Sequence, residues 1–375
     1  MGNVYVVKST GDLLTDALCC LGIFELALKV DPFIKGSCTL GRAEILRLKT
    51  EITKQDFEVK LLGELMELSR DPAIQDILSF RVNTGRRDKK FVPAHEILAN
   101  SVKKIIGGLK EESFKPLLKA KKKDLETFYM SINPIYGKGL RKYDKAMDGL
   151  SEAGTPEIIT AYLVGLALHT IKWEEREEKT TKRVHLLVTP PIGSEVNENY
   201  LKALRRLSIL YSTEDAYAYF RSLENVPRSV LPVVVLAYFD FSLLSVMSNI
   251  PPHLMVFDVE EERGGGQASR LYKSFSTNAF FSFFMRLGAD VHEVKEYIKS
   301  LVRARRRNEA RSLIDSILID LSGAIANGDA MRFNKALYAS FSIEERLKED
   351  LKKYVKLEKL RSKVAGKAVA CLLRT

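Results

Sequence analysis

Several features that define large classes of proteins are scarce in this sequence. The four cysteines, Cys19, Cys20, Cys38 and Cys371, include no CxxC pair, so no disulfide framework is indicated. The most apolar run, residues 230–239, is ten residues long, about half of the roughly 20 that a membrane span needs. The N-terminus lacks the basic-then-apolar order of a signal peptide. The sequence therefore predicts a cytoplasmic protein without a membrane partner.

The motifs of common enzyme classes are missing as well. There is no GxxxxGK[ST], GxSxG or HExxH segment, and Gly137-Lys138 lacks both the upstream glycine and the following hydroxyl residue of a P-loop. The five histidines are scattered, which gives no zinc site. His169 lies in an apolar helical segment, where a hydrogen-bonded core histidine is expected. We therefore predict no cofactor and no enzymatic activity.

Acidic residues near two expected strands leave an enzymatic function as an alternative. The apolar run 230–239 is expected to be a buried strand followed by Asp240, and Asp258, with Glu260, Glu261 and Glu262, is expected to follow another strand. Carboxylates at the ends of neighbouring strands can hold Mg²⁺ for phosphodiester hydrolysis. A metal-dependent nuclease centred on Asp240 and Asp258 is thus an alternative, and a solvated charge run that closes a strand is the plainer interpretation.

Positive charge is abundant and unevenly distributed. The net charge is +11, but residues 86–143 alone carry +9 and residues 277–375 carry +8, while the rest of the chain sums to −6. A basic surface confined to two blocks is typical of a protein that binds a polyanion.

Within the two basic blocks, lysine and arginine residues occur in clusters, some of which include aromatic residues. Tyr136 and Tyr143 flank one of them and could stack on unpaired bases. Lysines on one helical face near the C-terminus lack an acidic residue three or four positions earlier, so they repel one another and favour an external anion. The predicted nucleic-acid-binding residues of these clusters are Arg86, Arg87, Lys89, Lys90, Lys121, Lys122, Lys123, Lys138, Arg141, Lys142, Arg305, Arg306, Arg307, Lys356, Lys359 and Lys363.

The periodicity of the chain predicts an α+β fold. Residues 4–9, 185–190 and 253–259 are expected strands, and residues 14–30, 157–173 and 197–212 are expected helices, without a regular βα alternation. We expect an N-terminal mixed α/β domain with a largely antiparallel sheet over residues 1–275, which includes the basic insertion at 86–143.

Helix signals dominate from about residue 276, so residues 276–375 are expected to form a C-terminal helical bundle. Asp290 with Glu293 and Ser342 with Glu345 have the spacing of capping boxes. Apolar stripes follow within 291–302 and 310–325, and Asn327-Gly328 is expected to end the second helix. The low glutamine content, three residues, is typical of hyperthermophile proteins.

The segment STGDLLTDALCCLGIFEL (9–26) resembles a signature near the start of CRISPR-associated large subunits. The matching residues are Thr10, Gly11, Asp12, Asp16 and Ala17. With the basic α+β composition and the helical C-terminus, the chain looks like the large subunit of the archaeal type I-A Cascade complex (the Cas-eight-a family). The resemblance implies a non-enzymatic antiviral subunit that binds the crRNA 5′ end and target double-stranded DNA, recognises the protospacer-adjacent motif and stabilises the R-loop. The implied protein partners are the backbone, small and 5′-handle-binding subunits and a recruited helicase–nuclease.

The resemblance also suggests a role for a glycine triplet at 264–266. In related large subunits a glycine-rich loop enters the DNA minor groove at the motif, where only a degenerate code is available. Gly264, Gly265 and Gly266 would allow the close approach, Gln267 would wedge or contact a base, and Arg263 and Arg270 would anchor phosphates. The alternatives are a surface loop without a ligand and, for the whole chain, a stand-alone archaeal nucleic-acid-binding protein.

Overall fold

A computed structural model describes most of the chain. The described residues are 3–9, 13–83, 91–110, 126–127, 153–154, 156–177, 180–211, 213–247, 249–262, 272–306, 308–346 and 366–373. They form two four-stranded antiparallel sheets in the N-terminal part and helices in the C-terminal part, which confirms the predicted α+β class. No helix among these residues is long and apolar enough to cross a membrane.

The chain divides into two compact units. The first comprises residues 1–208 and 255–274, and the second comprises 209–254 and 275–375. The second unit thus joins residues 209–254 to the helices that follow residue 275. The reason is that this segment supplies apolar helices whose buried faces need the helices that follow residue 275.

The first sheet has the strand order β1-β3-β2-β10, with all neighbours antiparallel. Its strands are β1 (Asn3–Lys8), β2 (Lys35–Thr39), β3 (Glu44–Thr50) and β10 (Glu195–Asn197). From Leu46 to Thr50 of β3, residues alternate between buried and exposed, as in a sheet covered on one face. The long helix α1 (Leu13–Val30) provides the apolar cover and is buried over most of its length.

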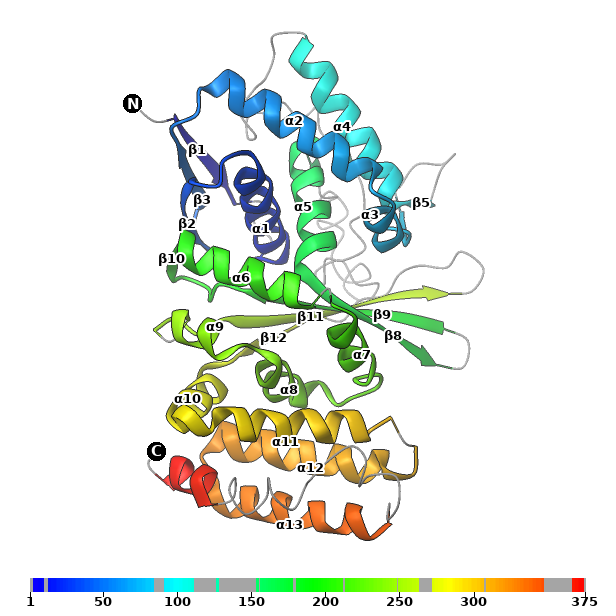
Figure 1. The fold of residues 1–375 in the computed structure, drawn as a ribbon. Coiled ribbons are helices and arrows are strands. Elements are labelled where there is room, and N and C mark those ends of the chain that lie inside the picture. The colour runs from blue at the N-terminus through cyan, green and yellow to red at the C-terminus, as the bar shows by residue number, and fades with distance from the viewer. Residues whose placement is uncertain are drawn as a thin grey trace, which may run out of the picture. The chain divides into compact units, whose positions relative to one another are not determined.

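Helix α1 packs closely against α5 (Pro156–His169), and both are almost entirely apolar (Figure 1). A helix that is hydrophobic on all sides must be buried on all sides. The remaining helices of this region are α2 (Lys54–Arg70), α3 (Pro72–Ile77), α4 (Ala94–Lys110) and α6 (Glu198–Tyr211), and short strand pairs join β4 (Arg81–Asn83) to β5 (Phe91–Pro93) and β6 (Glu126–Thr127) to β7 (Ala153–Gly154).

Local capping residues explain where several helices begin. Thr53 caps α2 and accepts a hydrogen bond from the backbone N–H of Asp56 at 3.2 Å, and Asp71 caps α3 in the same way through Ala73 N at 2.8 Å. Pro72 occupies the first turn of α3, where its missing N–H costs nothing. These side chains satisfy backbone donors that a helix start leaves without partners.

The second sheet has the order β12-β11-β9-β8. Its strands are β8 (Thr170–Glu177), β9 (Thr180–Thr189), β11 (His253–Glu262) and β12 (Tyr272–Ser276). The three predicted strands are thus present as β1, β9 and β11, with the last two longer than expected. The helix predicted at 157–173 ends at His169, because the β-branched and aromatic residues that follow pair in β8 with β9.

The second unit is helical. It contains α7 (Glu214–Arg221), α8 (Leu231–Tyr238), α9 (Phe241–Val246), α10 (Asn278–Leu287), α11 (Val291–Ala304), α12 (Asn308–Asn327) and α13 (Ala330–Arg346), with 3₁₀ turns at Arg228–Val230 and Gly288–Asp290 and a helical segment at 366–373. The predicted stripe of α11 is buried, as are Ile314, Ile317 and Leu321 of α12. α12 ends at Asn327, and Gly328 follows at φ +66°, as predicted.

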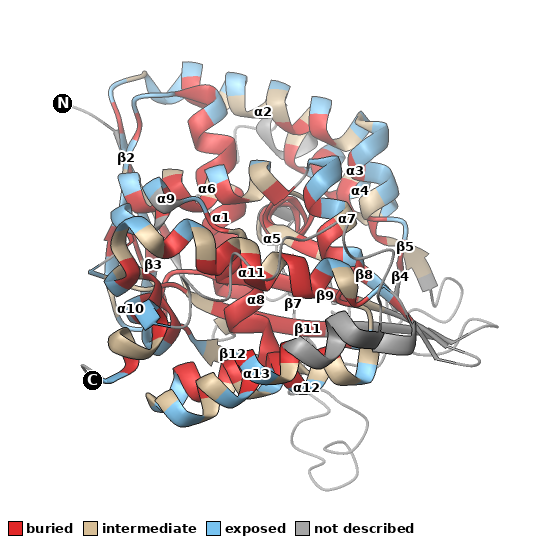
Figure 2. Cartoon of the chain, turned by 60° about the horizontal axis from the view of Figure 1, so that its bottom comes forward, coloured by how far each residue is buried: buried red, intermediate tan, exposed pale blue. Residues whose placement is uncertain are grey.

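Two predictions for this unit are wrong. The run 230–239 is the helix α8 and not a strand; Leu231–Ala237 are all buried, as Figure 2 shows in red. Pro232 in its first turn suits a helix start, and a short apolar run cannot distinguish strand from buried helix by periodicity. The second wrong prediction concerns the capping boxes: Ser342 and Glu345 both lie inside α13, and Asp290 stands at the N-cap of α11 without a side-chain capping hydrogen bond.

Candidate nucleic-acid interface

Of the predicted arginines, Arg305 and Arg306 lie at the junction of α11 and α12, with Arg311 of α12 nearby, beside the C-terminal end of α7. Arg305 is buried, with 2% of its surface exposed. Its Nε donates to Asp315 Oδ1 at 2.5 Å and its Nη2 to Asp315 Oδ2 at 3.2 Å, a bidentate ion pair. Its Nη1 donates to the carbonyl oxygens of Ser222 at 2.7 Å and Glu224 at 2.6 Å. Arg305 is therefore committed to internal contacts and does not reach an external phosphate in this arrangement.

Arg306 and Arg311 also contact the end of α7. Arg306 is exposed and donates from Nε to Ser222 Oγ at 2.7 Å and from Nη2 to the carbonyl oxygen of Ala218. Arg311 is partly buried and donates from Nη2 to the carbonyl oxygen of Glu224. Carbonyls at a helix C-terminus lack intrahelical donors and carry partial negative charge, so cations there stabilise the helix.

These residues line a polar hollow of about 520 Å³ in the second unit. Arg221 and Tyr217 of α7 border it, both exposed, and 55% of the surface of Tyr217 is open to solvent. Glu214 and Glu224 also line it, which offsets part of the arginine charge. An exposed aromatic ring beside guanidinium groups is a combination that binds single-stranded nucleic acid by stacking and phosphate contact.

The other predicted nucleic-acid-binding residues lie outside the described part of the chain. These are Arg86, Arg87, Lys89, Lys90, Lys121, Lys122, Lys123, Lys138, Arg141, Lys142, Arg263, Gly264, Gly265, Gly266, Gln267, Arg270, Arg307, Lys356, Lys359 and Lys363. Of the signature residues, Asp16 and Ala17 are buried in α1. Ser9 Oγ donates a hydrogen bond to Asp16 Oδ2 at 2.5 Å, so this carboxylate links the residue after β1 to the first turn of α1.

The carboxylates of the nuclease alternative have different structural settings. Asp240 does not follow a strand; it caps α9, where its carboxylate accepts from Ser242 Oγ at 3.0 Å and from Ser242 N at 3.4 Å. Asp258 lies within β11 and not after it. Asp240 and Asp258 belong to different compact units. Within the described ranges no three His, Cys, Asp or Glu side chains group so as to hold a metal ion.

A buried polar cluster in the first unit was missed by sequence reasoning except for one member. Glu25 of α1 accepts from Arg205 Nε at 2.7 Å, and its carboxylate lies 3.8 Å from His169 Nε2. Ser208 of α6 lies 3.0 Å from His169 Nδ1 and donates to the Leu204 carbonyl at 3.1 Å. Burial lowers the pKa of His169 to about 4, and Arg205 adds to this effect while Glu25 opposes it.

This cluster satisfies buried polar groups, which is a structural role. At neutral pH the imidazole of His169 is uncharged, because its pKa lies well below 7. The hydrogen bond to Ser208 confirms the predicted core histidine. The sequence did contain one signal for this cluster. Glu25 lies among apolar residues of a helix that was expected to be buried, and a buried carboxylate requires a cationic partner.

Comparison of the chain with protein-family models and with curated proteins finds no match in either case.

Proposed function

We propose that this protein binds nucleic acid as the large subunit of a CRISPR effector complex. The observation that carries the proposal is the distribution of charge: two blocks of +9 and +8 in a chain whose remaining residues sum to −6. A protein that neutralises DNA or RNA phosphates needs a concentrated basic surface, whereas scattered lysines would serve solubility alone. The resemblance of residues 9–26 to large subunits supplies the choice of complex.

In this role the protein works through binding energy and not through bond cleavage. It would hold the crRNA 5′ end, read the protospacer-adjacent motif in target double-stranded DNA and stabilise the separated strands, while the guide RNA reads the sequence. The other Cascade subunits and the helicase–nuclease would be its protein partners. Arg221, Arg306 and Tyr217 are exposed around one hollow, which suits contact with a displaced single strand.

The decisive test of the complex is a pull-down of the tagged protein from its own host. Co-purified RNA would be sequenced and co-purified proteins identified. Short RNAs that share a repeat-derived 5′ handle, together with Cascade backbone subunits, are the expected result. Unrelated RNAs would favour a stand-alone nucleic-acid-binding protein, and the absence of any nucleic acid would contradict both versions of the proposal.

Two sets of variants test the binding surface. Replacing Lys356, Lys359 and Lys363 with alanine should reduce the slope of log K against log salt by about 2–3, because each phosphate contact contributes about 0.7–0.9 to that slope. Replacing Gly264, Gly265 and Gly266 with alanine should weaken binding to motif-bearing DNA but leave non-specific binding unchanged. An unchanged slope removes the lysines from the interface, and unchanged motif preference removes the glycine loop.

A further inference from the structure

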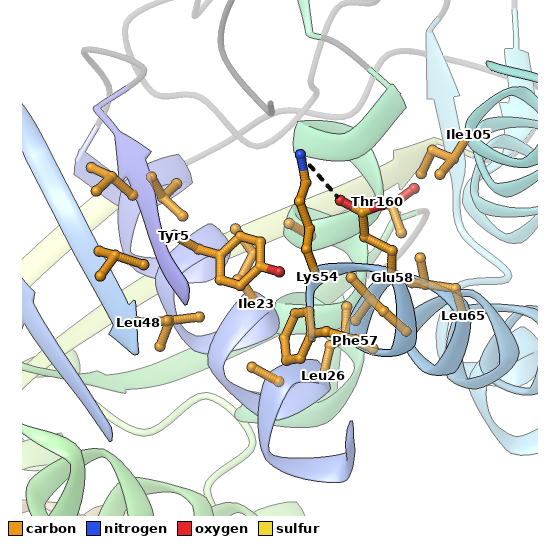
Figure 3. Close-up of a pocket in the computed structure, with 16 residues that line it drawn as sticks. Tyr5, Ile23, Leu26, Leu48, Lys54, Phe57, Glu58, Leu65, Ile105 and Thr160 are labelled. Carbon is orange, nitrogen blue, oxygen red and sulfur yellow. Dashed lines mark ion pairs between the residues drawn. The ribbon is translucent and has the colours of Figure 1, made fainter. Parts of the chain in front are cut away.

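A largely apolar pocket of about 380 Å³ lies inside the first unit. Its walls come from β1, β3, α1, α2, α4 and α5, and Figure 3 shows Ile23, Leu26, Leu48 and Leu65 around it. All of these elements belong to the same compact unit. A volume of this size, bordered by elements that are far apart in the sequence, is in the range of small-molecule sites.

Three polar atoms of this pocket have no hydrogen-bond partner among the described residues. They are the Tyr5 hydroxyl, Glu58 Oε1 and Thr160 Oγ1, and each is shielded from solvent. Only 2% of the surface of Thr160 is exposed. Lys54 Nζ lies 3.7 Å from Glu58 Oε1, which is an ion pair but longer than a hydrogen bond (Figure 3). Because buried polar groups in folded proteins almost always have partners, three of them around one space point to a ligand.

The charges of the pocket indicate a neutral ligand. Lys54 and Glu58 carry opposite charges and face each other. Burial and the nearby Glu58 carboxylate raise the pKa of the Tyr5 phenol, so it stays protonated at neutral pH. The polar groups therefore carry no net charge. An ionic ligand would lose its hydration against apolar walls without gaining a counter-ion.

The dimensions of the pocket indicate a ligand larger than one ring. A cavity of about 150 Å³ lined by aliphatic and aromatic side chains is enough for benzene, and this pocket is more than twice that size. The ring of Tyr5 stacks on that of Phe57, with centroids 4.9 Å apart and an angle of 25° between the planes, and both rings line the pocket. A wall of stacked rings suits a flat apolar body.

We propose that this pocket binds a neutral, mostly apolar small molecule of at least two fused rings that carries one hydroxyl or amide head group. The head group donates a hydrogen bond to Glu58 Oε1 and exchanges hydrogen bonds with the hydroxyls of Tyr5 and Thr160, and the apolar body lies against Ile23, Leu26 and Leu65.

Equilibrium dialysis of the full-length protein against 2-naphthol tests the proposal, with naphthalene as a comparison that lacks the hydroxyl. The expected result is saturable binding of one 2-naphthol per chain and an affinity for naphthalene that is about tenfold lower. Tyr5→Phe and Thr160→Val each remove one polar atom and keep the side-chain volume. Each should raise the Kd for 2-naphthol about fivefold, the effect of one lost hydrogen bond.

The matched control is Glu67→Gln, which changes an exposed carboxylate on the same helix as Glu58 and should leave the Kd unchanged. Glu58→Gln should weaken binding. Absence of saturable binding to the wild-type protein overturns the proposal, and so does equal affinity for 2-naphthol and naphthalene. Because that comparison uses the wild-type protein alone, it decides the matter even where a pocket variant fails to fold.

Discussion

Gly22 of α1 and Gly165 of α5 lie at the point where the two helices come closest. A Cβ atom added to Gly22 would be 2.1 Å from the carbonyl oxygen of Ala161, and one added to Gly165 would be 2.1 Å from the carbonyl oxygen of Leu18. Each contact is with the backbone of the other helix, which cannot rotate away as a side chain can. The absence of two side chains is thus what allows α1 and α5 to pack so closely.

Gly22→Ala and Gly165→Ala should therefore each destabilise the protein. Overpacking a core costs about 1–3 kcal/mol, and a clash with backbone lies at the upper end of that range even after the helix propensity of alanine is counted. Chemical denaturation would measure the free energy of unfolding. Gly63→Ala is the matched control, because a Cβ there meets nothing within 4 Å inside α2, and it should stabilise by about 0.5–1 kcal/mol. Equal effects at the three sites would contradict this account of the crossing.

The fold was predictable from sequence where a local pattern and the tertiary context agree. The strand at 4–9, the helix at 14–30 and the stripe beginning at Val291 were recognised because their periodicities match their surroundings in the folded protein. The run 230–239 was misassigned because a segment buried on all sides shows no period. Asp240 then acquired a false position at a strand end, and the nuclease interpretation depended on that position.

The site was less predictable than the fold, since charge alone does not distinguish an external from an internal role. Arg305 and Arg306 are adjacent in sequence and indistinguishable by composition, yet one is buried against Asp315 and the other is exposed. The pocket beside Tyr5 was not foreseen, because its residues come from six elements and no local pattern unites them. Only the tertiary arrangement shows that Tyr5, Glu58 and Thr160 line one pocket.

The ion pair between buried Glu25 and partly exposed Arg205 should stabilise the protein only while both partners are present. The side chain of Glu25 is 8% exposed and that of Arg205 is 38% exposed, so solvent screens the arginine in part. Arg205→Met leaves a buried carboxylate without its cation and should lower the free energy of unfolding by about 2–3 kcal/mol, less than a fully buried pair would lose. Adding Glu25→Gln should restore part of that loss. A double variant less stable than Arg205→Met would contradict the assigned pairing.

His185 should make the protein less stable in acid. Burial lowers its pKa to about 3, with Lys172 and Arg183 adding to the effect. The unfolded chain binds a proton near pH 6.5 and the folded chain does not, so the stabilisation is present above pH 6.5 and is lost as the pH falls towards 3. His185 should contribute up to about 1.4 kcal/mol per pH unit to the slope of the free energy of unfolding against pH.

The ring of His185 stacks on that of Phe257 at a centroid distance of 5.1 Å. His185→Phe tests the pH dependence because it removes the titratable group and keeps an aromatic ring at this position. Denaturation of both proteins between pH 7 and pH 4 would give the two slopes. The variant should lose the histidine's share of the pH dependence, so the stability difference between the proteins should shift in its favour as the pH falls. Parallel curves would show that His185 takes up its proton equally in both states.

Substitutions of Arg305 and Arg306 should have different effects, one on stability and the other on nucleic-acid binding. Arg305→Met leaves Asp315 without its bidentate partner and the carbonyls of Ser222 and Glu224 without a donor, so it should cost about 3 kcal/mol or more of stability. Arg306→Ala removes an exposed guanidinium and should cost about 1 kcal/mol or less. The effects on binding to single-stranded DNA should be the opposite. Arg306→Ala should reduce the slope of log K against log salt by about 0.7, whereas the folded Arg305→Met protein should keep the wild-type slope. If Arg305→Met alone lowered the slope, Arg305 would contact phosphate directly and its internal contacts would have to open on binding.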